Sequence, residues 1–380
     1  MKDGPTRLRL ARTTGVGPIL YRRLMQRFGS AEAALAELPA IASRAGRSQP
    51  LDTPSLGSVQ REMAAVARLG GHFLFVDTPD YPPLLALLND APPAIAVLGN
   101  TEYFSRTGVA LVGARNASAN GMRFAAELSG DLAGRGLAVV SGLARGIDAA
   151  AHRGALKTGE TIACIAGGLD RPYPPEHADL LAEIAERGLV VAEAPLGTAP
   201  QARHFPRRNR VIAGLSLGVV VVEAAFRSGS LITARLAQEE GRELFSVPGS
   251  PLDARCHGSN WLIKQGAQMV ETADDVIANL PPHPKLEGIS RDPLFARETQ
   301  APRPRPPEIA DFAPPQAVAA VTALLSPVPT AVDDLIAHCQ FSAPEVRAAL
   351  LDLELAGRVE ALPGSRVALL SPGQLSVTST

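Results

Sequence analysis

The sequence predicts an α/β protein built on a doubly wound sheet. Two short runs, Val109 to Val112 and Leu137 to Val140, are apolar and rich in valine, as buried strands are. Each run ends in a glycine-containing turn and is followed by an alanine-rich segment with helical periodicity. The strand–turn–helix unit therefore occurs twice in succession, which is the pattern of this class of sheet.

Both turns suit an anionic ligand, because ligands of doubly wound sheets bind beyond the carboxyl ends of the strands. Glycine lets backbone N–H groups approach a phosphate, the helix N-terminus attracts it, and an arginine can bind it with two parallel hydrogen bonds. The alternative is that the glycines only shape tight turns and the arginines are solvated. We predict phosphate contacts from these turns at Gly113, Arg115, Ser141, Gly142, Arg145 and Gly146.

Length and composition indicate two or three domains with ample apolar content for a core, since the chain has 380 residues of which 46% are hydrophobic. The formal net charge is only −1, so a polyanion site must be a local concentration of basic residues. The basic residues are almost all arginine, which suits phosphate binding and is also typical of a GC-rich genome.

Cysteine spacing and hydropathy exclude several other classes of protein. Cys164, Cys256 and Cys339 are scattered, and no histidine lies at metal-ligand spacing, so we expect no disulfide framework, no metal and no cofactor. The N-terminal segment has no signal-peptide core, and no apolar run is long enough to span a bilayer. We expect a cytoplasmic protein that does not contact a membrane.

The first segment, residues 1–72, predicts a small helical domain of the SAM or helix–hairpin–helix kind. Gly15 and Gly17 lie between two helical segments, and their N–H groups could approach a DNA phosphate. A tight connection between helices explains the same pattern. Ser30 is expected to cap a helix over Ala31 to Leu38.

The sheet domain is predicted over residues 73–282. Apolar runs from Phe73 to Val76, from Ala94 to Leu98 and from Leu217 to Val222 are further strand candidates. Ala234 to Glu240 has the pattern of a helix. Residues 283–315 are rich in proline and predict an extended linker.

The last segment, residues 316–380, has the pattern of a winged helix. Three helices, Val318 to Leu325, Val332 to His338 and Pro344 to Gly357, precede a hairpin of Val359 to Leu362 and Val367 to Leu370 around Pro363-Gly364. In many winged helices the third helix contacts duplex DNA. That helix is acidic on balance here, which favours contact with a protein or weak contact with DNA.

An ordered series of motifs resembles the DNA-processing protein A (DprA, Smf-like) family over roughly residues 75 to 275. It includes Asp80-Tyr81-Pro82-Pro83, Val112-Gly113-x-Arg115, Ser141-Gly142-x-Ala144-x-Gly146-Ile147-Asp148, Ala166-Gly167-Gly168-Leu169-Asp170-x-x-Tyr173-Pro174, Phe205-Pro206-x-Arg208-Asn209-Arg210 and Ser228-Gly229-Ser230-Leu231-Ile232-Thr233-Ala234. One departure is Ala192, where the family usually has serine before the glutamate at Glu193.

The resemblance implies a Rossmann-like domain that binds single-stranded DNA without being an enzyme. It implies protection of incoming DNA during natural transformation, help in loading a RecA-type recombinase, and a homodimer formed through the Rossmann-like domain. Leu231 to Leu236 or the region of Trp261 could contribute to that dimer. The motifs add Gly167, Gly168, Phe205, Arg208, Asn209, Arg210, Ser228, Gly229, Ser230 and Thr233 to the predicted DNA contacts.

Two of these motifs also have a physical interpretation. Arginines around Phe205 suit a single-stranded nucleic acid, because cations follow the backbone and a ring can stack on a base. Phe205 could instead belong to the core. The Ser228-Gly229-Ser230 turn leaves N–H groups for an anion at a helix start, and Ser230 could be only an N-cap.

An enzyme is the second class of function. Asp148 and His152 lie four residues apart and face the same way on a helix, but no nucleophile or second carboxylate accompanies them. We expect a helix-surface hydrogen bond that orients Arg145 or the turn, and no catalytic residue. A related Rossmann-like group cleaves a base from a ribose phosphate, yet its loop glutamate has no counterpart directly after Thr233. A nicotinamide dehydrogenase is disfavoured because no G-x-G-x-x-G follows a strand.

Overall fold

The computed structural model describes residues 3–44, 51–281, 314–355, 358–362 and 366–370. The chain divides into two compact units, Met1–Val59 with Ser290–Thr380, and Gln60–Ile289. The predicted linker, 283–315, lies outside the described residues except for positions 314 and 315, and Pro315 already begins a helix. Among the helices that the structure describes, none combines the length and the apolar character needed to cross a bilayer.

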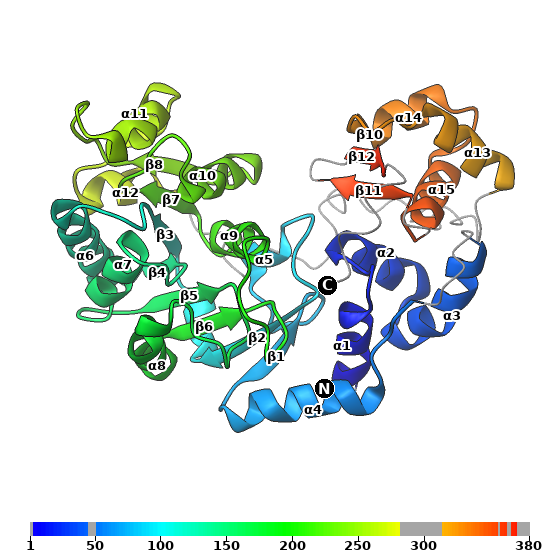
Figure 1. Ribbon diagram of the computed structural model, residues 1–380, viewed down its shortest axis with the longest axis horizontal. Coiled ribbons are helices and arrows are strands. Elements are labelled where there is room, and N and C mark those ends of the chain that lie inside the picture. Colours follow the sequence, from blue (N-terminus) through cyan, green and yellow to red (C-terminus); the bar gives the residue numbers. More distant parts are fainter. Residues whose placement is uncertain (1–2, 45–50, 282–313, 356–357, 363–365, 371–380) are drawn as a thin grey trace, which may run out of the picture. The chain divides into compact units, whose positions relative to one another are not determined.

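The unit Gln60–Ile289 is built on one nine-stranded sheet in the order β1-β2-β6-β5-β4-β3-β7-β8-β9 (Figure 1). Strands β3 to β9 run parallel to their neighbours, whereas β1 and β2 are added antiparallel. The strands are β1 (His72–Phe75), β2 (Ala94–Gly99), β3 (Gly108–Val112), β4 (Ala138–Ser141), β5 (Thr161–Ile165), β6 (Leu189–Ala192), β7 (Gly218–Val221), β8 (Glu243–Ser246) and β9 (Gln268–Met269).

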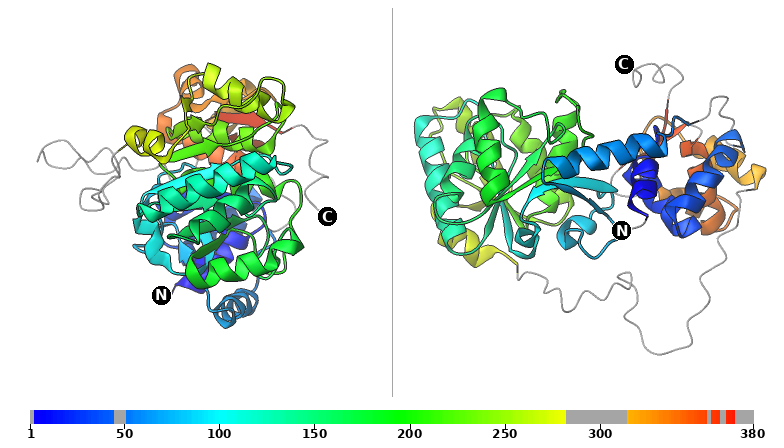
Figure 2. Two further views of the ribbon diagram at one scale, coloured as in Figure 1. Left: turned by 90° about the vertical axis from the view of Figure 1, so that its left-hand side faces the viewer. Right: turned by 90° about the horizontal axis from the view of Figure 1, so that it is seen from below.

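Helices lie on both sides of this sheet (Figure 2). They are α4 (Leu56–Arg68), α5 (Pro83–Ala86), α6 (Ala119–Gly134), α7 (Ile147–Ala155), α8 (Ala178–Arg187), α9 (His204–Gly214), α10 (Gly229–Glu239), α11 (His257–Lys264) and α12 (Ala273–Asn279), with short 3₁₀ helices at Thr101–Ser105, Pro175–His177 and Ala254–Cys256. Crossovers run outward from β3 in one direction through β4, β5 and β6, and then in the other through β7 and β8. The predicted doubly wound sheet is confirmed, and its order reverses at β3.

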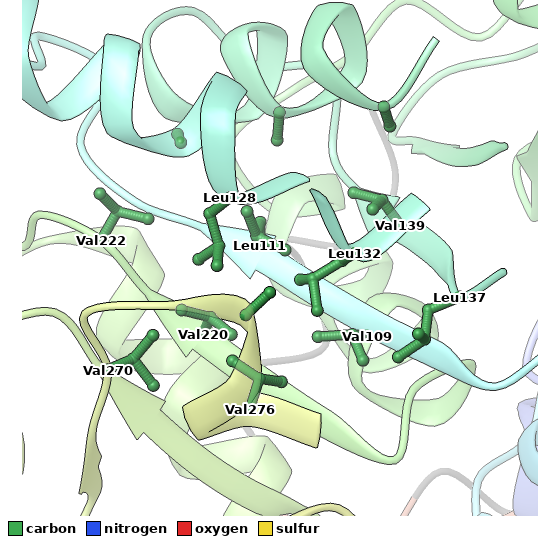
Figure 3. Packing of buried hydrophobic residues seen from close by; sticks show 14 of the residues in the cluster. Val109, Leu111, Leu128, Leu132, Leu137, Val139, Val220, Val222, Val270 and Val276 are labelled. Carbon is green, nitrogen blue, oxygen red and sulfur yellow. The ribbon is translucent and has the colours of Figure 1, made fainter. Parts of the chain in front are cut away.

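The core explains why the valine-rich runs become strands. Every residue of β3 and β4 is buried, because both faces of the sheet are covered, and a strand of this kind has no polar alternation. Val109 and Leu111 of β3 pack with Leu128 and Leu132 of α6 (Figure 3). The Ser118 hydroxyl caps α6 by accepting a hydrogen bond from the Gly121 N–H at 2.9 Å.

One boundary in this unit differs from the prediction. Helix α10 begins at Gly229, five residues before the predicted start at Ala234. Ser228 caps it, because the Ser228 Oγ accepts a hydrogen bond from the Ser230 N–H at 3.3 Å. The turn predicted to precede the helix is therefore mostly its first turn.

The other unit contains a helical N-terminal segment and a winged-helix domain. The first has α1 (Gly4–Arg12), α2 (Pro18–Phe28) and α3 (Ala31–Arg44), and the Ser30 Oγ accepts from the Ala33 N–H as a cap should. The second has α13 (Pro315–Leu324), β10 (Thr330–Ala331), α14 (Val332–His338), α15 (Ala343–Leu355), β11 (Val359–Leu362) and β12 (Arg366–Leu369). The short strand β10 was not predicted, and the predicted turn at Pro363-Gly364 lies outside the described residues.

Candidate functional site

A small pocket opens beside the point where the strand order reverses. It lies beyond the carboxyl ends of β3, β4 and β5 and has a volume of about 60 Å³. The lining residues are Arg115, Gly142, Ala144, Arg145, Ile165, Ala166, Gly167, Arg171, Tyr173, Pro174, Phe205 and Arg208.

One wall of the pocket combines aromatic rings with guanidinium groups. The Arg115 Cζ lies 4.7 Å from the centre of the Phe205 ring, and the Arg208 Cζ lies 5.9 Å from it. The Tyr173 ring is tilted by 58° against Phe205, with 5.7 Å between the ring centres. Phe205 is half-buried between these neighbours, whereas Tyr173 is 45% exposed. The ring available to a ligand is therefore chiefly that of Tyr173.

The charged rim of the pocket is only partly neutralised. Arg145 pairs with Glu176, and Arg171 lies 3.6 Å from Asp170. The hydrogen bond from Arg145 lowers the pKa of the Glu176 carboxyl. Arg115 has no carboxylate within 4.0 Å among the described residues. It is exposed, so its guanidinium is the most available cation of the pocket.

The turn after β4 satisfies its own hydrogen bonds. The Asp148 carboxylate accepts from the N–H groups of Gly142 at 3.2 Å and Ala144 at 3.3 Å. Between them Leu143 has a left-handed backbone with φ of 59°, and His177 Nδ1 donates to the Leu143 carbonyl at 2.9 Å. The expectation that this turn offers free N–H groups to a phosphate is therefore wrong for Gly142, because a buried carboxylate already holds that group.

The first turn is occupied in the same way. Glu223, which follows β7, accepts from the Ser118 N–H at 2.9 Å and from the Ser118 hydroxyl at 2.5 Å, so a carboxylate sits at the start of α6. Gly113 permits close packing, since a Cβ there would lie 2.5 Å from Ile147. The predicted anion site at this helix N-terminus is thus filled by the protein itself.

Helix α9 carries one predicted arginine into the pocket and keeps another away from it. Arg208 is buried and donates to the carbonyls of Gly142 and Cys164, the latter at 2.8 Å. Arg210 is also buried, where it pairs with Glu193 at 2.6 Å and donates to the Asp90 carbonyl. Of these two predicted contacts, Arg208 therefore lines the pocket together with Arg115, and Arg210 does not.

Burial dominates the chemistry beneath the pocket. It lowers the pKa of Arg208 and raises that of Asp148, although the two opposite charges favour one another's ionised form. It also lowers the pKa of His152 to about 3 and raises that of the Cys164 thiol to about 12. His152 Nδ1 lies 2.6 Å from the Thr161 hydroxyl. The expected hydrogen bond that orients the turn is made by Asp148, but both Asp148 and His152 are buried rather than on the helix surface.

The pocket brings together six of the sixteen predicted contacts, namely Arg115, Gly142, Arg145, Gly167, Phe205 and Arg208. Ten others do not line it: Gly113, Ser141, Gly146, Gly168, Asn209, Arg210, Ser228, Gly229, Ser230 and Thr233. Ser141 is fully buried, and its hydroxyl donates to the Leu111 carbonyl at 2.6 Å. Thr233 and Asn209 are buried as well.

Sequence reasoning missed Arg171 and Tyr173 as parts of the pocket. Both follow the glycine pair at the end of β5, in a motif from which only Gly167 and Gly168 were predicted as contacts. An aromatic residue and an arginine three or more residues beyond a buried strand were the available signal.

Comparisons with known proteins identify the family. The family model described as DNA recombination-mediator protein A matches residues 72–281. The chain belongs to this family. Models for the DprA-like N-terminal HHH domain and the DprA winged helix domain match residues 2–65 and 301–365. The DprA family assignment and the three-part fold expected from the motifs are thereby confirmed.

Relatives of this DprA-family chain are similar over most of its length. Protein Smf of Synechocystis is 35% identical and aligns with 93% of this chain and 95% of that protein. The X-ray structure of DprA from Streptococcus pneumoniae has a TM-score of 0.64 at 35% identity, covering 73% of this chain and 97% of that one. DprA from Helicobacter pylori, whose structure concerns its single-stranded DNA binding mode, has a TM-score of 0.50 at 30% identity, covering 54% and 94%.

Proposed function

We propose that this protein binds single-stranded DNA through the pocket at the switch point, without catalysing a reaction on it. The observation that carries the proposal is the cluster of Arg115, Tyr173 and Phe205. An exposed ring beside an arginine without an acidic partner is suited to an unpaired base with its phosphate. The single-stranded DNA binding mode described for the Helicobacter pylori relative supports the same class of ligand.

The absence of catalysis is supported by the chemistry of the pocket lining. No carboxylate, thiol or imidazole side chain is among the described residues that line it. Asp148 and His152 are buried, so neither is placed to exchange a proton with a bound nucleotide. The alternative, cleavage of a base from a ribose phosphate, requires a carboxylate at the reacting centre.

The biological setting is also part of the proposal. We infer a cytoplasmic role in DNA processing during natural transformation and homologous recombination, with protection of incoming single strands and loading of a RecA-type recombinase. We further infer a homodimer of the sheet domain. Trp261 and Met269, the latter on edge strand β9, are large apolar side chains exposed in this unit, which supports such an interface.

Fluorescence anisotropy with labelled oligonucleotides tests the central claim. Single-stranded and duplex oligonucleotides of one sequence are titrated at several salt concentrations. We expect preference for the single strand and affinity that falls as salt rises, because arginine contacts release counterions and only unpaired bases can stack. Equal affinity for both forms contradicts the proposal, and release of free base from the oligonucleotide contradicts its non-enzymatic part.

A further inference from the structure

A second aromatic residue is exposed on the same edge of the sheet, outside the pocket. Phe226 belongs to the loop between β7 and α10, and 59% of its side chain is exposed. Arg227 follows it, is exposed, and has no carboxylate within 4.0 Å among the described residues. Outside the pocket, Phe226 and Arg227 therefore repeat the combination of an exposed ring with an exposed arginine.

The Phe226 ring is held by its surroundings. It lies against the His257 ring, with 6.1 Å between the ring centres and 55° between their planes. His257 is itself oriented, because its Nε2 donates to the Pro251 carbonyl at 2.9 Å. The Gly258 N–H donates to the Ala224 carbonyl at 2.6 Å and so ties the start of α11 to the loop that carries Phe226.

This aromatic pair continues a basic edge. Each of the parallel strands β3 to β8 is followed by an arginine that reaches solvent. In the order of the strands along the sheet, from β6 to β8, these are Arg203, Arg171, Arg145, Arg115, Arg227 and Arg255. Arg255, which follows β8, is the farthest of these arginines from the pocket on the β7 side, and it pairs with Asp253. The edge therefore offers cations to a backbone that runs from the pocket across β7 toward β8.

The spacing of strands sets the length of nucleic acid that reaches this point. The pocket lies at β5, β4 and β3, and Phe226 and His257 follow β7 and β8. From β4, the middle strand of the pocket, β7 and β8 are two and three strand spacings of ~4.8 Å away, about 10–14 Å. A stacked single strand advances ~3.4 Å for each nucleotide, so on the order of three to four nucleotides bridge the two places.

We propose that Phe226, with Arg227 and His257, forms a second base-stacking subsite for the single strand that enters the pocket. The inference rests on the proposed function and adds to it a direction along the sheet and a minimum length of ligand. The repeated combination of an exposed ring with an arginine free of acidic partners supports a nucleic acid as the occupant. A second copy of the chain is the competing occupant, and the experiment distinguishes it.

The test compares two thymidine oligonucleotides, one of ~2 nucleotides that is too short to bridge the two places and one of ~10 that spans both. Phe226→Ala should weaken binding of the longer oligonucleotide about tenfold, since stacking on one ring contributes that order of affinity, and leave the shorter one unchanged. Phe226→Trp keeps an aromatic ring and should bind the longer oligonucleotide with the affinity of the wild type. Leu252→Ala is the matched control, because it removes an aliphatic side chain that is 97% exposed in the loop after β8.

Each outcome decides between the proposals. If Arg115→Ala weakens the binding of both oligonucleotides but Phe226→Ala weakens the binding of neither, the second subsite is refuted and the proposal for the pocket is kept. If neither variant weakens the binding of either oligonucleotide, the proposed function itself is contradicted. If Phe226→Ala instead dissociates a dimer in sedimentation and its DNA affinity recovers at high protein concentration, Phe226 is a contact between copies. As a direct readout, the fluorescence of 2-aminopurine in the longer oligonucleotide should be quenched when the wild-type protein binds, and quenched less when Phe226→Ala binds.

Discussion

Arg115→Ala is the most informative single change, because Arg115 is an exposed pocket arginine with no carboxylate within 4.0 Å among the described residues, and its guanidinium lies over the Phe205 ring. A charge-assisted contact to phosphate contributes roughly 1.5–3 kcal/mol, and none of the other pocket arginines is as free to replace it. Affinity for single-stranded DNA should therefore fall about ten- to a hundredfold. The loss should be similar for every base sequence, since a phosphate contact carries no base information.

The same change should leave the fold intact. Loss of the contact between Arg115 and Phe205 removes about 0.5–1 kcal/mol at an exposed site, so the melting temperature should move little. Arg115→Lys keeps the charge but not the planar fork, and an intermediate affinity is expected. Arg123→Ala on α6 is the control, because that side chain is 74% exposed and lies in a surface ion pair with Glu127.

Anisotropy titrations over a range of salt concentrations measure both consequences. The slope of log affinity against log salt should become shallower by about 0.7 for a single-stranded ligand, which corresponds to one phosphate contact fewer. A correctly folded Arg115→Ala protein with unchanged affinity and unchanged slope would refute the reasoning, and the DNA site would then have to lie elsewhere on the chain.

Three further changes test the pocket and the layer beneath it. Tyr173→Ala should weaken single-strand binding roughly five- to a hundredfold and Tyr173→Phe should preserve it, since the ring rather than the hydroxyl stacks; equal loss in both excludes stacking. Gly142→Ala places a Cβ against the buried Arg208 guanidinium and should lower the free energy of unfolding by about 1–3 kcal/mol, whereas Gly229→Ala, with no atom within 4 Å of the new Cβ, should not. The low pKa of His152, about 3, means that only the unfolded chain binds its proton between that value and about 6.5, so stability is full above this window and is lost as pH falls through it. Between about pH 7 and pH 5 the loss should be about 2 kcal/mol in chemical denaturation, and His152→Leu should remove this part; an identical pH profile in the variant contradicts the assignment.

Local patterns in the sequence were sufficient to predict the fold class, but not every strand of the sheet. The runs that became β3 and β4 are apolar throughout because both sheet faces are covered, so the lack of polar alternation in the sequence predicts buried strands. Residues of the glycine turns after them line the pocket, since the carboxyl ends of adjacent parallel strands meet at one edge. The start of α10 was missed because Ser228 and Gly229 suit both a loop and a capped first turn.

The partners of the site residues could not be predicted in the same way. Glu223 meets Ser118 from 105 positions away, and Arg210 meets Glu193 from 17 positions away, so neither pair has a spacing that a sequence reveals. Arg208 and Arg210 are buried whereas Arg115 is exposed, and nothing in the sequence distinguishes these three arginines. Tyr173 was overlooked because exposure of one ring depends on tertiary packing rather than on its neighbours in the chain.

The carboxylates of Asp148 and Glu223 have a consequence for selectivity in a cell that is crowded with free nucleotides. They occupy turn and helix-start N–H groups of the kind that bind the pyrophosphate of a soluble dinucleotide in other doubly wound sheets. A mononucleotide would have to displace a built-in anion to gain those contacts, whereas a polymer can bind through side chains spread along the rim. Millimolar metabolites should then compete poorly, and the strand should be recognised by its continuity rather than by any one phosphate.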